Sequence, residues 1–387
     1  MNVVVVGGGI VGLSSAYYLA DAGADVTLCE KGALGTRSTA RSAGGIRSQF
    51  STEINVCLSL ASREVWDAFE EEFGVDMAYR KHGYLFLARD PETAEAFRGN
   101  VAMQNDLGVG SEYITPEAAR EHCPELRADR FVAATYNAAD GYADPNLAVQ
   151  GYAAKARDAG VDVRTKTDVT DVLVDEGADE RIITGVETED GRIEADFVVN
   201  AAGAWAARIA GMAGVNLPIH PRRRQISMVD PSLTLPEDVP LTIDLDTGSY
   251  FRPERDGTAL VGGHFAGDDP DVDADAYTES MDIDWAATAV ERAADCARYF
   301  DGDSRIKSGW AGLYAVTPDH HPIVEETVPG LVTAAGFSGH GFQHAPATGR
   351  LVAELCVDGE ASLVDVTPLS SRRFEADGEE LVERNVA

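Results

Sequence analysis

The stretch MNVVVVGGGIVGLSSAYYLADAGADVTLCEKG, residues 1–32, decides the fold. Val3–Val6 is a run of β-branched residues, which is typical of a strand buried on both faces. A glycine-rich turn and a helical pattern follow, and Gly23 ends the predicted helix. Residues 25–29 form a second predicted strand that closes at Glu30. Strand, turn, helix and strand in this order predict a Rossmann-like unit of a parallel α/β sheet.

The glycines of the turn have the GxGxxG spacing of a dinucleotide site. Gly7 permits the tight turn, Gly9 lets the backbone approach a pyrophosphate, and Gly12 lets the helix pack on the strand. The exposed N–H groups at the helix start favour the phosphate charge. Glu30 can accept both hydroxyls of an adenosine ribose and would repel a 2′-phosphate, which disfavours NADP. The complete unit also disfavours a fold that has lost its ligand.

The composition excludes several classes of partner. The chain has 387 residues, which suggests two domains, and a net charge of −33 from 65 acidic and 32 basic residues. Such a charge repels nucleic acid and anionic membranes, so neither is expected as a partner. The acidic residues are spread along the whole chain. We therefore interpret them as a halophilic surface adaptation, because salt screens their repulsion.

The cysteines and the apolar runs predict a cytoplasmic protein. The five cysteines, Cys29, Cys57, Cys123, Cys296 and Cys356, include no CxxC pair, and their odd number fits a reducing compartment. The chain begins directly with a strand, so no signal peptide is expected. No apolar run reaches the roughly 18 residues of a membrane span.

The rest of the chain favours FAD over NAD as the dinucleotide. A second fingerprint for NAD and a redox-active cysteine pair are both absent from the sequence. Residues 167–206 read as three or four strands with a turn at Gly191. They end in a buried strand, Phe197–Asn200, and in small residues that allow close approach to a ligand. The chain thus returns to its first domain late, whereas NAD dehydrogenases usually keep one continuous nucleotide domain.

Four sequence blocks carry a resemblance to a known family. They are VVVVGGGIVG to Glu30, STARSAGGIR (38–47), VVNAAGAW (198–205), and WAGLYAVTPDHHPIV (310–324) with GFSGHGF (336–342). The chain resembles the D-amino-acid-oxidase-like family of FAD-dependent oxidoreductases. Within it, the chain is most similar to the branch of sarcosine oxidase, sarcosine oxidase β-subunit and archaeal proline dehydrogenase β-subunit. These blocks span nearly the whole sequence.

The resemblance implies a site for non-covalent FAD. The expected cofactor-binding residues are Gly7, Gly9, Ile10, Val11, Gly12, Glu30, Lys31, Arg41, Ser42, Ala43, Gly44, Gly45, Ile46, Val169, Ala202, Gly203, Trp205, Gly312, Tyr314, Gly336, Ser338, Gly339, His340, Gly341 and Phe342. Where the family's sarcosine oxidases attach the flavin through a cysteine, this chain has Gly312.

The segment GFSGHGF is implied to run beside the flavin ring. Its glycines would let backbone N–H groups face the ring, and a helix predicted over 344–356 would add positive potential there. A metal site on His340 and His344 is disfavoured, because Gly341 lies between them and no further ligand pattern completes a site. A serine nucleophile needs GxSxG, which Ser338 does not satisfy.

The fold class expected is α/β plus α+β, a Rossmann-like FAD-binding domain with a second domain built on an antiparallel β-sheet. The FAD domain takes residues 1–80, 140–215 and 301–387. The substrate domain takes residues 81–139 and 216–300, where strand-like pieces remain. The acidic tail over 370–387 reads as a surface helix or a disordered segment.

The candidate catalytic residues are His264, Tyr250, Gln343 and Arg47. Residues 249–265 read as a hairpin with its turn at 256–257, which places Tyr250 and His264 near the open ends of adjacent strands. In sarcosine oxidases a Tyr and a His at matching positions line the substrate pocket, whereas a lone strand histidine is otherwise structural. Arg47 could face the flavin or order its loop.

Three departures from those oxidases bear on the substrate and the acceptor. Leu260 stands where a lysine assists oxygen, which favours a dehydrogenase with an acceptor that is neither oxygen nor NAD. Gln343 and Phe50 stand where the family's sarcosine oxidases hold the substrate carboxylate, so either sarcosine is not the substrate or another cation takes over. Arg222–Arg224 are candidates, and a solvated surface is the alternative reading.

The predicted function is oxidation of a small amino acid or N-methyl amino acid, with sarcosine, glycine and proline as models. Hydride transfer to the flavin N5 would give an imine that water hydrolyses. The alternatives are a 2-hydroxy acid or glycerol-3-phosphate dehydrogenase of the same fold, and a flavin-carrying subunit of a larger complex with partner subunits. A protein that only senses NAD is a more distant alternative.

Overall fold

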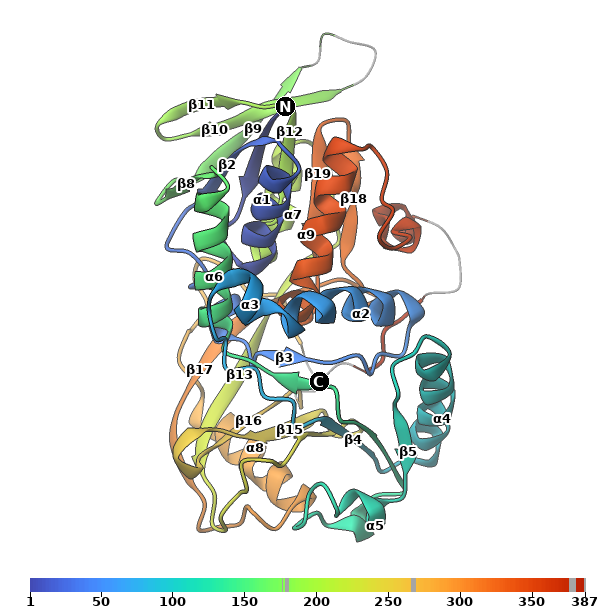
Figure 1. Ribbon diagram of the computed structural model, residues 1–387. Coiled ribbons are helices and arrows are strands. Elements are labelled where there is room, and N and C mark those ends of the chain that lie inside the picture. The colour runs from blue at the N-terminus through green and yellow to red at the C-terminus, as the bar shows by residue number, and fades with distance from the viewer. Residues whose placement is uncertain (176, 178–180, 266–268, 376–380, 386–387) are drawn as a thin grey trace.

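A computed structural model of the protein describes residues 1–175, 177, 181–265, 269–375 and 381–385. The first of its two large sheets has six strands and lies in the upper part of Figure 1. In spatial order the strands are β18 (Ile323–Val328), β19 (Leu331–Ala335), β12 (Phe197–Asn200), β1 (Asn2–Val6), β2 (Asp25–Glu30) and β8 (Asp162–Thr165). All neighbours are parallel except β18, which is antiparallel to β19. The Rossmann-like prediction from residues 1–32 is confirmed.

Both faces of this sheet are covered. Val3 and Val5 of β1 pack under α1 (Ile10–Asp21), α6 (Pro145–Asp158) and α9 (Gly341–Val357). Val4 and Val6 pack on the other side against α7 (Ala206–Met212) and a three-stranded sheet. That sheet has β11 (Gly191–Glu194), β10 (Ile182–Thr188) and β9 (Val169–Asp175). With β12 of the six-stranded sheet, residues 167–206 therefore contain four strands, within the three or four that the sequence predicted. Burial on both sides explains the unbroken valine run of β1.

The second sheet has eight strands and lies in the lower part of Figure 1. Its order is β17 (Arg305–Val316), β13 (His220–Asp230), β16 (Ala259–Gly263), β15 (Ser249–Pro253), β14 (Leu241–Asp244), β4 (Tyr84–Ala88), β6 (Ala133–Asn137) and β5 (Glu112–Ile114). The predicted hairpin is confirmed as β15 and β16. The sheet is antiparallel as expected except for one parallel pair, β14 with β4.

The remaining elements connect and cover the two sheets. The helices are α2 (Glu53–Asp67), α3 (Phe69–Phe73), α4 (Pro91–Asp106), α5 (Pro116–Ala119) and α8 (Ile283–Cys296), with a two-stranded pair of β3 (Gly45–Ile46) and β7 (Gly141–Tyr142). Short 3-10 turns are η1 (Thr39–Arg41), η2 (Ala128–Arg130), η3 (Gly203–Trp205), η4 (Arg255–Gly257), η5 (Thr367–Leu369) and η6 (Ser371–Phe374). Figure 1 shows α2 crossing between the sheets. No helix of the described residues is long and apolar enough to cross a membrane.

The two faces of the eight-stranded sheet have different neighbours. Phe251 and Val261 point to one face, where they pack with Ala289 and Ala293 of α8. Tyr84, Phe86 and Tyr250 point to the other face. Loop 41–45 packs on this second face, since the Trp310 indole N–H donates to the Arg41 carbonyl at 2.9 Å. One face therefore builds a core, and the other is turned toward the first sheet.

Two features of the fold differ from what the sequence suggested. β17 falls in the segment expected to join the FAD domain at residue 301, yet it pairs along its length with β13 in the second sheet. The domain division stays a proposal, with residues 305–316 better placed in the second unit. The tail is also different where the structure describes it, because Glu383 and Asn385 are buried. Residues 376–380 and 386–387 of that tail lie outside the described residues.

Candidate active site

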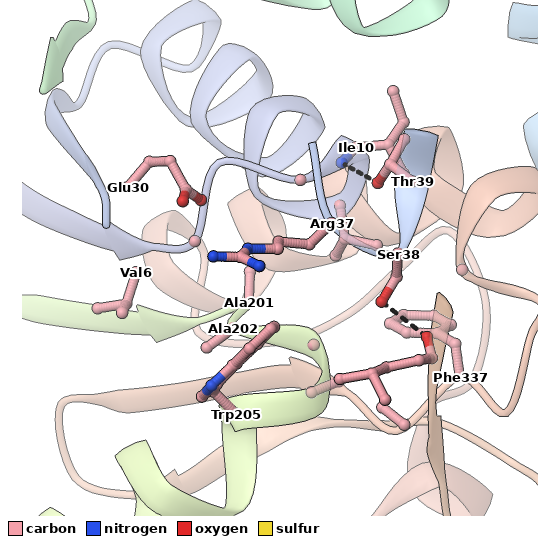
Figure 2. Close-up of a pocket in the computed structure, with 18 of the residues that line it drawn as sticks. Val6, Ile10, Glu30, Arg37, Ser38, Thr39, Ala201, Ala202, Trp205 and Phe337 are labelled. Carbon is pink, nitrogen blue, oxygen red and sulfur yellow. Dashed lines mark hydrogen bonds between the residues drawn. The ribbon is translucent and has the colours of Figure 1, made fainter. Parts of the chain in front are cut away.

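A long cavity opens at the carboxyl ends of β1 and β12 (Figure 2). Its walls come from the GxGxxG turn, the end of β2, the 3-10 turn after β12, and loop 336–342. Its empty volume is about 1320 Å³, counting the part open to solvent. The lining runs from the end of β2 at Glu30, past the glycine turn, to loop 336–342, so the cavity suits an elongated ligand such as a dinucleotide.

Close packing explains the glycine turn. A side-chain Cβ at Gly7 would lie 2.5 Å from the Ala201 carbonyl oxygen, and Gly7 has a φ of +112°. A Cβ at Gly12 would lie 1.9 Å from the Gly7 carbonyl oxygen. A Cβ at Gly9 would meet only the Thr39 hydroxyl, at 3.4 Å, so backbone is open to the cavity there. Gly7 and Gly12 shape the turn, and Gly9 leaves room for phosphate at the start of α1.

Two polar groups hold the turn in place. The Glu30 carboxylate accepts the Gly8 N–H at 2.7 Å and the Gly32 N–H at 2.6 Å, which keeps it at the cavity wall. Figure 2 shows the Thr39 hydroxyl accepting the Ile10 N–H, at 3.2 Å. The Ser38 hydroxyl donates to the Leu313 carbonyl at 2.7 Å and so ties loop 38–42 to β17. The donor-rich turn and the carboxylate fit the pyrophosphate and ribose of FAD.

Loop 336–342 forms the far wall of the cavity. The Ser338 N–H donates to the Ala315 carbonyl at 2.8 Å, and Ser338 has a φ of +49°. A Cβ at Gly339 would lie 2.4 Å from the Tyr314 ring, so only glycine lets this ring pack on the loop. The helix expected over 344–356 starts at Gly341, with His340 as its N-cap residue. The prediction that Gly341 lies outside a regular helix is wrong. Gly341 lies in the first turn of α9, where the backbone N–H groups have no partner within the helix.

Most residues expected to bind FAD line the cavity. These are Gly7, Gly9, Ile10, Val11, Glu30, Lys31, Ser42, Val169, Ala202, Gly203, Trp205, Tyr314, Gly336, Ser338, Gly339, Gly341 and Phe342. Eight others do not line it: Gly12, Arg41, Ala43, Gly44, Gly45, Ile46, Gly312 and His340. Two of these eight residues pack on each other, since a Cβ at Gly312 would meet the Arg41 side chain at 2.9 Å.

Several wall residues were not singled out from the sequence. They are Val6, Cys29, Ala33, Gly35, Thr36, Arg37, Ser38, Thr39, Thr167, Asp168, Ala201, Arg208, Ile209, Leu313, Ala315, Ala334, Ala335 and Phe337. Ser38 and Thr39 open the quoted block STARSAGGIR, so their hydroxyls were a usable signal. Arg208 lies in α7, three residues after Trp205. No sequence motif at this position indicates contact with a ligand.

A group of polar and aromatic side chains surrounds Tyr314 at the sheet side of the cavity. The His264 ring lies edge-on to the Tyr314 ring, with centroids 5.4 Å apart. The Arg224 guanidinium lies 5.5 Å from the Tyr314 centroid. Tyr250 lies on the same face of the sheet, against Gly262. The structure thus brings Tyr250 and His264 together as expected, and adds Arg224.

The electrostatics of this group favour neutral rings beside one cation. Burial, and then the positive charge of Arg224, lower the pKa of His264 to about 3. Burial raises the pKa of Tyr250 well above its usual value and raises that of Tyr314. At neutral pH, His264 is therefore an uncharged hydrogen-bonding group.

Arg47 and Gln343 lie elsewhere, behind the loop. Arg47 is buried, and its guanidinium donates to the carbonyls of Gln49 and Asn385 and packs 3.9 Å from the Phe50 ring centroid. The Gln343 side-chain oxygen accepts the Arg47 N–H at 2.8 Å. Neither residue lines the cavity. Arg47 orders its loop and the tail, which is the second of the two roles considered for it.

The described part of the tail is an internal brace. The Glu383 carboxylate accepts hydrogen bonds from the Ser51 N–H at 2.8 Å, the Thr52 hydroxyl at 2.8 Å and the Asn55 amide at 3.1 Å. Hydrogen bonds to residues this far away along the chain leave no pattern in the local sequence. The sequence therefore predicted a surface helix or a disordered segment here.

His340 and His344 are held by side chains. The His344 Nε2 lies 2.9 Å from the Ser59 hydroxyl, and the His340 Nε2 lies 3.4 Å from an Arg47 nitrogen. Among the described residues, no group of three or more His, Cys, Asp or Glu could hold a metal ion. Burial and then Arg47 lower the pKa of both histidines, that of His344 to about 3.

His344 should make the protein sensitive to acid. Its folded pKa of about 3 lies below the ordinary histidine pKa of 6.5, so its neutral ring contributes stability above about pH 6.5 that is lost as the pH falls toward 3. Glutamine can keep the bond to Ser59 without titrating. We expect the thermal unfolding midpoint of His344→Gln to fall less than that of the wild type between about pH 7 and pH 5. Circular dichroism in molar KCl measures both midpoints.

Asp140 provides a control of opposite sign. Burial raises its pKa from 3.8 to about 6, so it contributes stability at low pH that is lost as the pH rises through 6. Asp140→Asn should therefore lose more of its midpoint on acidification than the wild type. Equal acid sensitivity in His344→Gln and the wild type would contradict a neutral buried ring.

The fold and the cavity together define a dinucleotide-binding protein with a second sheet at one end of its ligand site. A family model described as FAD dependent oxidoreductase, DAO, matches residues 2–355, and the chain belongs to this family. It is an FAD-dependent enzyme, and the predicted fold class is confirmed.

Individual relatives agree with the family. The chain is 31% identical to FAD-dependent oxidoreductase domain-containing protein 1 of Xenopus laevis, over 100% of this chain and 84% of the relative. It is 29% identical to glycine oxidase of Geobacillus kaustophilus, over 96% of this chain and 97% of that enzyme. The crystal structure of L-proline dehydrogenase from P. horikoshii superposes with a TM-score of 0.87 at 36% identity, over 97% of both chains.

Proposed function

We propose that this enzyme oxidises a small amino acid, with a primary or secondary amine, to an imine. The observation that carries the proposal is the group of His264, Tyr250 and Arg224 around Tyr314, where the second sheet meets loop 336–342 of the cofactor cavity. Similarity to glycine oxidase and to L-proline dehydrogenase supports this substrate class. When bound, FAD supplies the hydride acceptor, and the protein supplies orientation and charge.

Arg224 is the residue proposed to bind the substrate carboxylate. Its guanidinium makes a two-pronged contact with the Asp269 carboxylate, with N–O distances of 2.6 and 2.7 Å. An amino acid carboxylate could make the same contact, because guanidinium and carboxylate match in this geometry. The Arg224 Nε is buried and has no hydrogen-bond partner among the described residues. This cation takes the place of the family lysine and arginine that Gln343 and Phe50 replace.

The neutral rings are proposed to handle the amine. An amine must lose its proton before its neighbouring C–H can leave as hydride, and a buried site disfavours the ammonium form. Neutral His264 can accept a hydrogen bond from the amine N–H while the carboxylate lies on Arg224. Tyr250 and Tyr314 would exclude water around the substrate. Gly312 offers no nucleophile, which supports non-covalent FAD.

An anaerobic titration tests the proposal. Purified protein in molar salt would be mixed separately with glycine, sarcosine, dimethylglycine, L-proline and D-alanine, and flavin absorbance recorded. Bleaching by at least one amine is expected. Bleaching only by L-2-hydroxyglutarate or glycerol 3-phosphate would overturn amine oxidation, and Arg222 beside Arg224 is the observation that favours such anions. A yellow protein that no compound bleaches would indicate a flavin-carrying subunit that needs a partner.

Finer features are part of the same proposal. The net charge of −33 supports a halophilic protein, so the unfolding midpoint should rise with KCl concentration. The free cysteines, four of them buried, support a reducing cytoplasmic location, which cell fractionation would test. Leu260 supports an acceptor that is neither oxygen nor NAD, and a slow reaction of the reduced enzyme with air would agree.

A further inference from the structure

An acidic segment, DPDVDADAYTESMD over 269–282, concentrates ion pairs in an unusual way; we name it the acidic strap. Its acids are Asp269, Asp271, Asp273, Asp275, Glu279 and Asp282. Its ion-pair partners include seven of the chain's 32 lysines and arginines: Lys31, Arg37, Arg41, Arg208, Arg222, Arg223 and Arg224. In a chain so poor in basic residues, this density marks a segment held in a defined place.

Asp275 joins two walls of the cofactor cavity where they meet. Its carboxylate lies 2.7 Å from the Lys31 Nζ, which follows β2, and accepts the Trp205 indole N–H at 2.8 Å, which follows β12. Arg208 of α7 adds a third contact at 3.2 Å. Lys31 also lies 3.8 Å from the Trp205 ring centroid. All three partners of Asp275 line the cavity, so the acidic strap lies over the place where these two walls meet.

Glu279 makes a second fastening. It pairs with Arg41 at 2.6 Å and with Arg37 at 3.3 Å, and Arg37 also lines the cavity. The backbone of the acidic strap is itself anchored, because the Ala311 N–H donates to the Glu279 carbonyl and Arg223 donates to the Thr278 carbonyl, both at 2.8 Å. The strap is thus attached to the edge of the second sheet and fastened to the first domain through side chains.

We propose that the acidic strap is a closure that retains FAD, with Asp275 and Glu279 as its fasteners. A dinucleotide that enters or leaves between the walls formed by Lys31 and Trp205 has to pass the strap, so release requires these contacts to break. Direct contacts of 2.6 to 3.3 Å are comparable to the Debye length of about 3 Å at 1 M salt, so they keep part of their attraction in concentrated salt. The acids of the strap thus have a role in cofactor binding besides surface hydration.

The test compares FAD dissociation from holoenzyme variants in molar KCl, followed by flavin fluorescence on dilution. Asp275→Asn and Glu279→Gln should each raise the dissociation rate, and the double variant should raise it by about five- to tenfold, as expected for the loss of several exposed ion pairs. Asp273→Asn is the matched control, since it removes the same charge from the same segment. Its side-chain oxygen, which accepts the Asp275 N–H at 2.9 Å, remains.

The outcomes separate a closure from a general effect. Faster FAD loss in the double variant, with Asp273→Asn like the wild type and equal unfolding midpoints of the apoproteins, supports the proposal. Unchanged dissociation in the double variant overturns it. An equal increase in Asp273→Asn also overturns it, because charge alone would then be the cause. If Asp275→Asn lowers apoprotein stability, the test uses Glu279→Gln alone. Faster FAD dissociation from that variant then supports the closure, and an unchanged rate overturns it.

Discussion

Arg224→Met is expected to lower kcat/KM for the amino acid substrate by about 10²- to 10³-fold, because removing one partner of a buried charge pair costs about 2–5 kcal/mol. Methionine keeps much of the side-chain volume and removes the charge. The loss should fall on substrate binding, since the carboxylate is bound equally before and during hydride transfer. Anaerobic stopped-flow reduction at increasing substrate concentration separates the apparent dissociation constant from the limiting rate.

Two variants of neighbouring residues control this experiment. Arg223 precedes Arg224 and points to the opposite face of β13, where it pairs with Asp282. Arg223→Met should therefore leave substrate binding close to that of the wild type. Asp269→Asn should tighten substrate binding by a few-fold, since it removes a carboxylate that competes for Arg224. A substrate dissociation constant in Arg224→Met equal to that of the wild type would exclude this carboxylate site.

Gly12→Ala is expected to weaken FAD binding by about 10- to 100-fold and to lower the free energy of unfolding by about 1–3 kcal/mol, the usual cost of overpacking. The reason is steric. The new Cβ would lie 1.9 Å from the Gly7 carbonyl oxygen, so the turn that lines the cavity has to shift. Fluorescence titration of apoprotein with FAD and denaturant unfolding measure the two effects.

Gly99→Ala is the matched control for this substitution. Gly99 lies inside α4, and a Cβ there meets nothing within 4 Å. This exchange should leave FAD affinity unchanged and stabilise the helix slightly, by about 0.5–1 kcal/mol. Wild-type FAD affinity in Gly12→Ala would show that the turn tolerates displacement and would contradict the packing argument.

The catalytic candidates show where prediction from sequence succeeds and fails. Tyr250 and His264 could be placed together because a hairpin with an Asp-Gly turn fixes its own register within 17 residues. Arg47 and Gln343 come from segments 296 residues apart, and the Gln343 side chain is held by the Arg47 backbone N–H. The Arg47 guanidinium is held behind the loop by the Gln49 and Asn385 carbonyls. No local pattern carries that information.

The predictions of where α9 starts and of which sheet contains β17 failed for a similar reason. Gly341 has low helix propensity, but the first turn of a helix lacks intrahelical N–H partners, and the loop before it is held by Tyr314 packing on Gly339. β17 could not be assigned to a sheet from its own residues, since strand pairing depends on β13, about 80 positions away.

The sequence by itself determined the Rossmann-like unit, the dinucleotide class of cofactor and the family. These depend on short-range requirements: a buried valine strand, glycines where a Cβ would strike backbone, and a carboxylate at the end of the next strand. Only the tertiary structure decided that Arg224 stands beside His264, that the tail braces Arg47, and that acids of the strap join the walls of the cavity. Those contacts join distant segments, and their energies depend on burial and distance that no spacing in the chain encodes.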